Sequence, residues 1–360
     1  MRVLCVFGTR PEAIKMAPVI KELKARSGVE CITCSTGQHR EMLDQVLKLF
    51  RVEPDHDLNI MQPNQTPVQV ASAAMERLDK VIRDGCFDWV LVQGDTTTAM
   101  AAALTAFYNR VKVGHVEAGL RTWDKWQPFP EEINRKVIGA ISDIHFAPTG
   151  RARENLLAEN VPDENIVVTG NTVIDALLWV ANSKPSDDAE ALLESLDIDE
   201  NQRLILVTAH RRENHGEPLR NICSALKEIA LCRPNEVRIV YPVHLNPNVW
   251  EPVHEMLGDV PGITLLRPLE YEPLVHLMKR AWLILTDSGG IQEEAPALGV
   301  PVLVLRNTTE RPEGIEAGTA KLVGTDRGKI IEEVFRLLDD PEERLRMSRA
   351  VNPYGAGAAS

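Results

Sequence analysis

The chain has 360 residues, which at about 100–200 residues per domain predicts two domains. Hydrophobic residues make up 44% of the sequence, enough for two buried cores, and this excludes a disordered or fibrous chain. The net charge of −12 argues against a general affinity for nucleic acid or for an anionic membrane, so an anionic ligand would need a local cluster of basic side chains.

The lengths of the apolar stretches indicate where the protein is located, and the cysteines indicate whether it binds a metal. No apolar stretch reaches the ~18 residues that a membrane helix needs, and the N-terminal apolar run is too short for a signal peptide. We therefore expect a cytoplasmic protein without membrane insertion, whose six cysteines stay reduced. Cys31 and Cys34 have CxxC spacing, but residues three apart in a strand point to opposite faces. A structural role is therefore favoured over a redox or zinc site.

Short β-rich runs alternate with helix-length amphipathic stretches along the whole chain. The strands expected in the first half span residues 2–7, 30–35, 89–92, 112–116, 143–147 and 166–169, with helices such as 11–25 and 97–109 between them. Those expected in the second half span residues 203–208, 237–242, 263–267, 282–286 and 301–305. This pattern predicts two doubly wound, Rossmann-like α/β domains facing a cleft, residues 1–170 and 171–360, with a hinge near 170–185.

Three carboxylates follow or flank predicted strands of the first half. Asp95 follows one strand, Glu117 ends the next, and Glu131 enters a helix from a proline-rich loop. Because carboxyl ends of parallel strands share one edge of the sheet, we expect these acids to converge, although Asp95 alone could be a helix cap. Acids sharing a cleft have their pKa values pushed apart, so that one can serve as base and another as acid.

Basic residues at strand ends predict an anion site. Arg10 and Lys15 lie on the helix that follows the first strand and can approach an anion near its N-terminus, unless they are merely solvated. Arg211 and Arg212 follow His210 after a strand of the second half. Two adjacent arginines are hard to bury unpaired, so we expect a phosphate or a carboxylate as their partner.

The segment Ser288-Gly289-Gly290 joins an apolar strand to a helix. Its bare backbone N–H groups can approach a diphosphate, and Glu294, about one turn further, can accept from ribose hydroxyls. Arg311 adds a cation to the same rim. The sequence lacks a Walker motif, a G-x-G-x-x-G motif and a cluster of metal ligands, which argues against ATPase, dehydrogenase and metalloenzyme functions.

Nine strings in this order resemble the non-hydrolysing UDP-N-acetylglucosamine 2-epimerases: FGTRPEAIKMAP, QGDTTT, GHVEAGLRTWDK, PEEINR, TAHRREN, PVHLNPNV, TDSGGIQEEAPALGVPVLVLR, TERPEG and NPYG. The resemblance implies a glycosyltransferase-B type fold, with UDP held by the second domain and the sugar facing the first. It also implies reversible conversion of UDP-GlcNAc to UDP-ManNAc, by anti elimination of UDP to 2-acetamidoglucal, for bacterial surface polysaccharide. A homodimer without cofactor or metal is expected.

The resemblance also assigns roles residue by residue. Its implied catalytic residues are Asp95, Glu117, Glu131 and His210. Its implied substrate-binding residues are Arg10, Lys15, Arg135, Arg211, Arg212, His244, Ser288, Gly289, Gly290, Glu294 and Arg311. Gln38 and His244 resemble part of a regulatory UDP-GlcNAc site, and His244 alone could equally be structural.

Three alternatives remain open at this point. A hydrolysing epimerase would release ManNAc and UDP, a glycosyltransferase could share the same fold, and a UDP-sugar sensor would have no activity. The acid triplet and the TAHRREN string favour an epimerase, because a transferase needs an acceptor groove and usually fewer catalytic acids.

Overall fold

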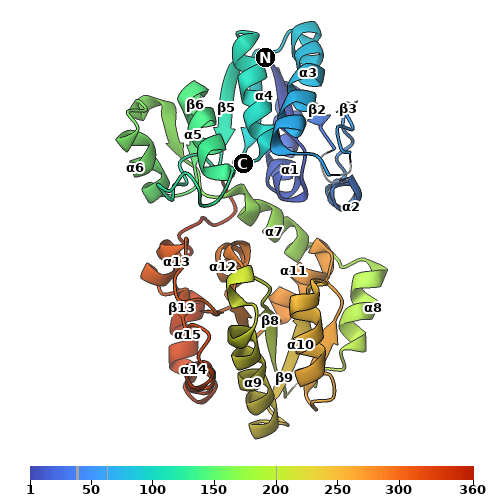
Figure 1. Ribbon diagram of the computed structural model, residues 1–360, viewed down its shortest axis with the longest axis vertical. Helices are drawn as coiled ribbons and strands as arrows, with labels where there is room; N and C mark the ends of the chain where they lie inside the picture. The colour runs from blue at the N-terminus through green and yellow to red at the C-terminus, as the bar shows by residue number, and fades with distance from the viewer. Residues whose placement is uncertain (38–39, 63, 200) are drawn as a thin grey trace. The chain divides into compact units, whose positions relative to one another are not determined.

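The computed structural model describes residues 1–37, 40–62, 64–199 and 201–360, which form two α/β units (Figure 1). The first unit comprises Met1–Ala176 together with Tyr354–Ser360, and the second comprises Leu177–Pro353. The boundary between them falls inside one helix, α7 (Thr172–Asn182).

Within the described residues, the first unit has a parallel sheet in the order β3-β2-β1-β4-β5-β6-β7. Its strands are β1 (Arg2–Phe7), β2 (Glu30–Ser35), β3 (His56–Asp57), β4 (Trp89–Gln93), β5 (Lys112–Val116), β6 (Ile144–Ala147) and β7 (Ile166–Val168). The apolar composition of most of these strands follows from burial, since a parallel sheet is covered by helices on both faces. The strand order reverses between β1 and β4.

The helices of the first unit are α1 (Arg10–Ala25), α2 (Arg40–Phe50), α3 (Pro67–Gly85), α4 (Thr97–Tyr108), α5 (Glu131–Ile141), α6 (Gly150–Ala158) and the first part of α7, with the short 3-10 helix η1 (Asp163–Asn165). A buried cluster joins Leu4 and Val92 of the sheet to Leu78 of α3 and Ala102 of α4. Figure 1 shows α3 and α4 beside each other in this unit.

Among the described strands, the second unit has the parallel order β10-β9-β8-β11-β12-β13, which matches the first unit without a counterpart of β7. The strands are β8 (Arg203–Thr208), β9 (Val237–Pro242), β10 (Ile263–Leu266), β11 (Leu283–Thr286), β12 (Val302–Val304) and β13 (Ala320–Leu322). The order reverses between β8 and β11. The helices are α8 (Asp187–Ser195), η2 (Arg212–Asn214), α9 (Glu217–Cys232), α10 (Pro247–Leu257), α11 (Tyr271–Arg280), α12 (Gly289–Glu294), η3 (Ala295–Leu298), α13 (Pro312–Glu316), α14 (Arg327–Asp339) and α15 (Pro341–Arg349).

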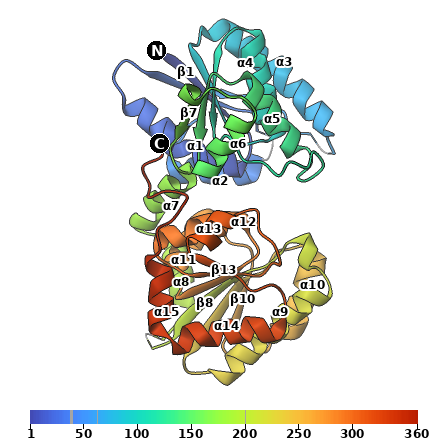
Figure 2. The ribbon, with the colours of Figure 1, turned by 90° about the vertical axis from the view of Figure 1, so that its left-hand side faces the viewer.

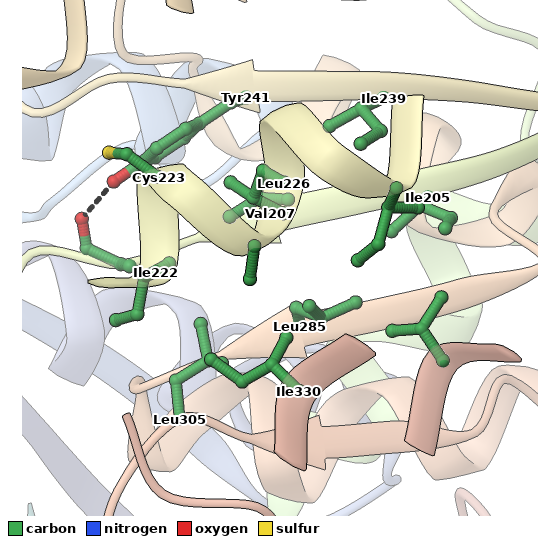
Figure 3. Packing of buried hydrophobic residues seen from close by; sticks show 14 of the residues in the cluster. Ile205, Val207, Ile222, Cys223, Leu226, Ile239, Tyr241, Leu285, Leu305 and Ile330 are labelled. Atoms are coloured by element: carbon green, nitrogen blue, oxygen red, sulfur yellow. Dashed lines mark hydrogen bonds between the residues drawn. The ribbon is translucent and has the colours of Figure 1, made fainter. Parts of the chain in front are cut away.

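One face of this second sheet packs against α9 and α14, which lie side by side (Figure 2). Figure 3 shows Val207 and Leu285 of the sheet among Leu226 of α9 and Ile330 of α14. The hydroxyl of Tyr241, also in this core, donates to the Ala209 carbonyl at 2.6 Å, the bond drawn as a dashed line. The core therefore reaches the end of β8, where the predicted site residues begin.

The last residues of the chain lie elsewhere than the sequence predicted, since the domain bounds placed them in the second half. Tyr354–Ser360 packs in the first unit, where the Asn171 N–H donates to the Tyr354 carbonyl at 2.7 Å. The Ser360 hydroxyl donates to Asp175 at 2.8 Å. A Cβ on Gly170 would lie 3.1 Å from the Tyr354 carbonyl oxygen, so glycine lets the two segments approach.

Two strands were not predicted, β3 and β13. The former has two exposed polar residues, and the three residues of the latter are interrupted by Lys321. Neither therefore carries an apolar run that a strand pattern would detect. No helix in the part of the chain that the structure describes is long and apolar enough to cross a membrane.

Candidate functional site

Several of the predicted site residues lie at the places within each unit where the strand order reverses. In the first unit, the ends of the neighbouring strands β1 and β4 lead into Arg10 and Asp95. In the second unit, the ends of β8 and β11 lead into His210 and Ser288. Ligands of doubly wound sheets bind at such points, because the loops there diverge and leave the strand ends open.

Glu117 follows β5, and three side chains donate hydrogen bonds to its carboxylate. Its carboxylate accepts a hydrogen bond from Lys15 Nζ at 2.5 Å, from the Gln93 amide at 2.5 Å and from the Asn171 amide at 2.9 Å. Its side chain is 7% exposed. The backbone φ of +64° is in the left-handed region, which costs a non-glycine residue about 1 kcal/mol or more and is concentrated at functional sites.

Asp95 forms the second part of this cluster. Arg135 Nη2 lies 2.6 Å from its carboxylate, and the Asn134 amide donates to its backbone carbonyl at 2.9 Å. Burial raises the pKa of Asp95, and the charges of Glu117 and Glu131 raise it further. Arg135 is the main opposing charge. The structure therefore brings the three predicted acids together with Arg135.

Three residues of this cluster, Gln93, Asn171 and Glu132, were not predicted as site residues. The side-chain amides of Gln93 and Asn171 donate to Glu117. The only sequence signal for this role is that Gln93 ends a strand and Asn171 precedes a helix. The buried Glu132 carboxylate accepts from the backbone N–H groups of Thr122 and Trp123, so it holds the loop before α5. Arg10, by contrast, begins α1 with a partly exposed side chain.

Asp287 connects the two strand ends in the second unit. Its fully buried carboxylate accepts from the backbone N–H groups of His210 and Arg211, each at 2.8 Å, and from the Asn214 amide at 2.9 Å. The end of β11 thus fixes the loop after β8. Asp287 was not among the predicted site residues, because only the strand pairing places it beside that loop.

His210 and His244 lie together at this end of the sheet. Their rings stack with centroids 5.4 Å apart and planes at 12°. Partial burial lowers the pKa of His210, and His244 and Arg211 lower it further, whereas the Asp287 carboxylate opposes this shift. The Nδ1 of His244 accepts from the backbone N–H of Asn246 at 3.1 Å, so its proton in the neutral form is on Nε2.

Carboxylates pair with three arginines of the second unit, Arg211, Arg306 and Arg311, and such a partner was among those expected for Arg211. Arg211 lies 3.0 Å from Glu310, whose other oxygen lies 2.5 Å from Arg306. A Cβ on Gly289 would lie 3.1 Å from the Glu310 carboxylate, so these charges surround the glycine turn. Arg311 pairs with Glu293, and the exposed Arg212 begins η2.

The glycine turn begins α12, and Glu294 is the last residue of this helix. The Ser288 N–H donates to the Thr286 hydroxyl at 2.9 Å, which shapes the turn. Glu294 is buried and accepts from the Tyr271 hydroxyl at 2.9 Å, and a Cβ on Gly290 would lie 3.9 Å from its other oxygen. Tyr271, on α11, was not predicted.

The structure also bears on metal binding and on the predicted regulatory site. Within the described ranges, no three His, Cys, Asp or Glu side chains are arranged to hold a metal ion. The six cysteines are free thiols. Gln38, predicted with His244 as part of a regulatory site, lies outside the described residues.

The sequence profile described as UDP-N-acetylglucosamine 2-epimerase matches residues 21–360. This chain belongs to the UDP-N-acetylglucosamine 2-epimerase family. The epimerase of that name from Salmonella typhimurium (strain LT2) is 57% identical, over 99% of this chain and 96% of the relative. That of Escherichia coli (strain K12) is 56% identical, over 100% of this chain and 96% of the relative.

A crystal structure extends the likeness to the fold. The UDP-GlcNAc 2-epimerase of Neisseria meningitidis bound to UDP-GlcNAc superposes with a TM-score of 0.88 at 49% identity, covering 100% of this chain and 97% of that one. The predicted membership of the epimerase family and the predicted class of two doubly wound, glycosyltransferase-B type α/β domains are thereby confirmed.

Proposed function

We propose that this epimerase interconverts UDP-GlcNAc and UDP-ManNAc without releasing free sugar. The observation that carries the proposal is the carboxylate cluster of Asp95, Glu117 and Glu131. Burial raises the pKa of Asp95, whereas Glu117 is paired with Lys15 at 2.5 Å. Carboxyl groups in such different surroundings suit opposite roles, one as proton donor and one as base.

Chemistry favours elimination as the route of inversion. The C2–H of the sugar is not next to a carbonyl carbon within the ring, so its direct removal would leave a poorly stabilised carbanion. In the elimination, a base takes the C2 proton, the C1–C2 double bond forms, and the C1–O bond breaks with its electron pair leaving on UDP. UDP then adds back to C1 as a proton reaches C2 from the opposite face.

The second unit offers groups suited to the leaving diphosphate. Arg211, Arg212 and His210 follow β8, and the Ser288-Gly289-Gly290 turn follows the neighbouring β11. Cations and N–H groups that are fixed before the reaction stabilise developing negative charge at little reorganisation cost. We assign Glu294 to the ribose and Arg311 to the nucleotide, and the remaining predicted residues, Arg10, Lys15, Arg135 and His244, to the sugar and diphosphate.

Proton NMR of the protein with UDP-GlcNAc in deuterium oxide tests the proposal. We expect UDP-ManNAc carrying deuterium at C2, formed without acceptor or added cofactor, and the same equilibrium from either sugar nucleotide. Free ManNAc and UDP as the only products would instead indicate a hydrolysing epimerase. Complete retention of the original C2 hydrogen in UDP-ManNAc would exclude the elimination.

A further inference from the structure

The carboxylate of Asp287 is completely buried, yet its hydrogen bonds are all on one oxygen. Oδ2 accepts from the backbone N–H groups of His210 and Arg211 and from the amide of Asn214. Oδ1 is buried without a hydrogen-bond partner in the described part of the chain. An unsatisfied buried oxygen of a charged group is costly, so its retention calls for a partner or a function.

The imidazole of His210 lies against this unsatisfied oxygen. Nδ1 of His210 is 3.7 Å from Oδ1 of Asp287. This distance is too short for a bridging water and about 0.8 Å longer than a hydrogen bond, so a small rotation of the ring is enough to form one. Catalytic hydrogen bonds are often this long in unliganded proteins and shorten when the ligand binds.

Three further side chains act on the His210 ring. His244 stacks on the ring, and Arg211 and His215 also act on it electrostatically. All three disfavour a proton on His210, while Asp287 favours one. The Asp287 carboxylate is thus the group that can accept a proton of this ring and balance its charge.

We propose that Asp287 is a positioning residue that fixes the His210 imidazole with its Nδ1–H directed at Oδ1, so that Nε2 faces the ligand. With the Nδ1 proton engaged, any proton exchanged with a ligand passes through Nε2. In the protonated ring, Nε2–H donates to an anionic oxygen while Nδ1–H remains on Asp287. The part that concerns a departing diphosphate rests on the proposed function.

The variant Asp287→Asn changes the group that orients His210 but keeps the hydrogen bonds that hold the loop after β8. Its amide oxygen can still accept from the three donors that Oδ2 serves, whereas its NH2 group faces Nδ1 and requires that nitrogen to accept. The neutral His210 proton then moves to Nε2, as in serine proteases in which the triad Asp is replaced by Asn. Removal of the carboxylate charge also lowers the His210 pKa, because the imidazolium loses its favourable partner.

Nitrogen-15 NMR of histidine-labelled protein tests the proposal without any substrate, with the His210 signals assigned by their loss in His210→Asn. We expect Nδ1–H in the wild type, Nε2–H in Asp287→Asn, and a lower His210 pKa in the variant. We also expect kcat for UDP-GlcNAc to fall by at least about a hundredfold, with the affinity for UDP changed less than about threefold.

Asn214→Ala is the matched control, because it removes a donor to the same carboxylate but leaves Oδ1 and His210 in place. We expect it to lower the stability while the His210 tautomer is retained and kcat changes less than about threefold. A merely structural role for Asp287 predicts the same pattern in both variants, and that result would overturn the proposal.

The spectrum of the wild type tests the proposed His210 tautomer even if Asp287→Asn does not fold. Nε2–H as the neutral form of His210 in the wild type overturns the inference. An active epimerase with that tautomer would refute the inference alone, whereas a wild type with Nδ1–H but without epimerisation would refute only the proposed function.

Discussion

Asp95, Glu117 and Glu131 share one edge of the first sheet but differ in their surroundings. Under the proposed mechanism, each has a task that an amide cannot perform. We expect Asp95→Asn, Glu117→Gln and Glu131→Gln each to lower kcat by roughly a hundredfold or more, the usual scale for loss of an acid or base. Steady-state kinetics, with UDP binding measured by calorimetry, checks this.

Glu154→Gln is the control for these variants, because this carboxylate is exposed on α6. It should leave kcat unchanged, and UDP binding should persist in all four variants. Near wild-type rates in all three cluster variants would place the reaction elsewhere in the protein.

The positions of these acids could be predicted from the sequence, but their partners could not. Strand-end residues such as Asp95 and Glu117 are detectable, because carboxyl ends of parallel strands always meet at one edge. Lys15 and Asn171, which bind Glu117, are 102 and 54 residues away along the chain. Pairings at such separations depend on strand order, which the sequence pattern alone does not fix. The role of Asp287 could not be predicted for the same reason, because it depends on the pairing of β11 with β8.

His115 gives a pH-dependent prediction for a buried residue behind the site. Its Nε2–H donates to the Gly94 carbonyl at 2.7 Å, and burial lowers its pKa to about 3. Between pH 6.5 and about 3 the unfolded chain binds a proton that the folded one does not. The free energy of unfolding should therefore fall by up to about 1.4 kcal/mol per pH unit on acidification.

Urea unfolding of the wild type and His115→Gln between pH 4 and 7 measures this slope. We expect the variant to lose most of this contribution, whatever its stability at pH 7. His56→Gln, at an exposed site, should keep the wild-type slope. An unchanged slope in His115→Gln would mean that His115 is protonated in the folded protein.

At the scale of the element, the start of α1 shows how one buried acid organises a loop. Glu12 accepts from the backbone N–H groups of Gly8 and Thr9 at 3.0 and 2.7 Å, and from the Thr96 hydroxyl at 2.6 Å. It thus completes a capping box and ties the loops after β1 and β4 together. Arg10 lies in the segment that it fixes.

We expect Glu12→Ala to lower the free energy of unfolding by about 2–4 kcal/mol, because it leaves buried donors unsatisfied. Urea denaturation measures the change. Glu22→Ala on the exposed side of the same helix should stay within about 0.5 kcal/mol of the wild type. Equal losses in the two variants would contradict the role of Glu12 as a cap.

Strands with apolar runs were predictable from the sequence, whereas strands that consist of polar residues or are interrupted by them were not. The strands from β1 to β12, with the exception of β3, lie where the sequence predicted them, because each contains a run rich in apolar or β-branched residues. The segment 354–360 has small and polar residues, so its packing in the first unit depends on backbone contacts with Asn171 and Asp175. The hinge near 170–185 stays a prediction.

At the scale of the whole molecule, the net charge of −12 contrasts with the local charge after the strands of the second unit. Arg211, Arg306 and Arg311 gather there, each paired with a carboxylate. The sequence predicted that an anion would need such a cluster, but not that Glu310 and Glu293 would hold it in place. A homodimer and a role in surface polysaccharide stay predictions.

The proposed function assigns UDP to the second unit and the sugar to the first, and this assignment yields a prediction for ligand binding. UDP lacks the sugar, so the proposed function assigns it to the second unit, where it should stabilise the folded state by about 2.7 kcal/mol at a hundredfold excess over its Kd. Hydrogen exchange should slow at residues 210–214 and 288–290 with UDP. With UDP-GlcNAc it should also slow at residues 94–96 and 117–119, since the sugar engages the acids.

Peptide-resolved hydrogen exchange by mass spectrometry checks this assignment, with two arginine variants as the comparison. Arg211→Gln should lose most of the protection by UDP, because the guanidinium is one of the few fixed cations at the glycine turn. Arg220→Gln, whose side chain pairs with Glu255 at the surface of α9, should keep it. Protection by UDP alone at residues 94–96 and 117–119, as strong as at 288–290, would mean that the nucleotide is bound by the first unit. The carboxylates there would then need a role other than proton transfer at C2, because the leaving group would occupy the place assigned to the sugar.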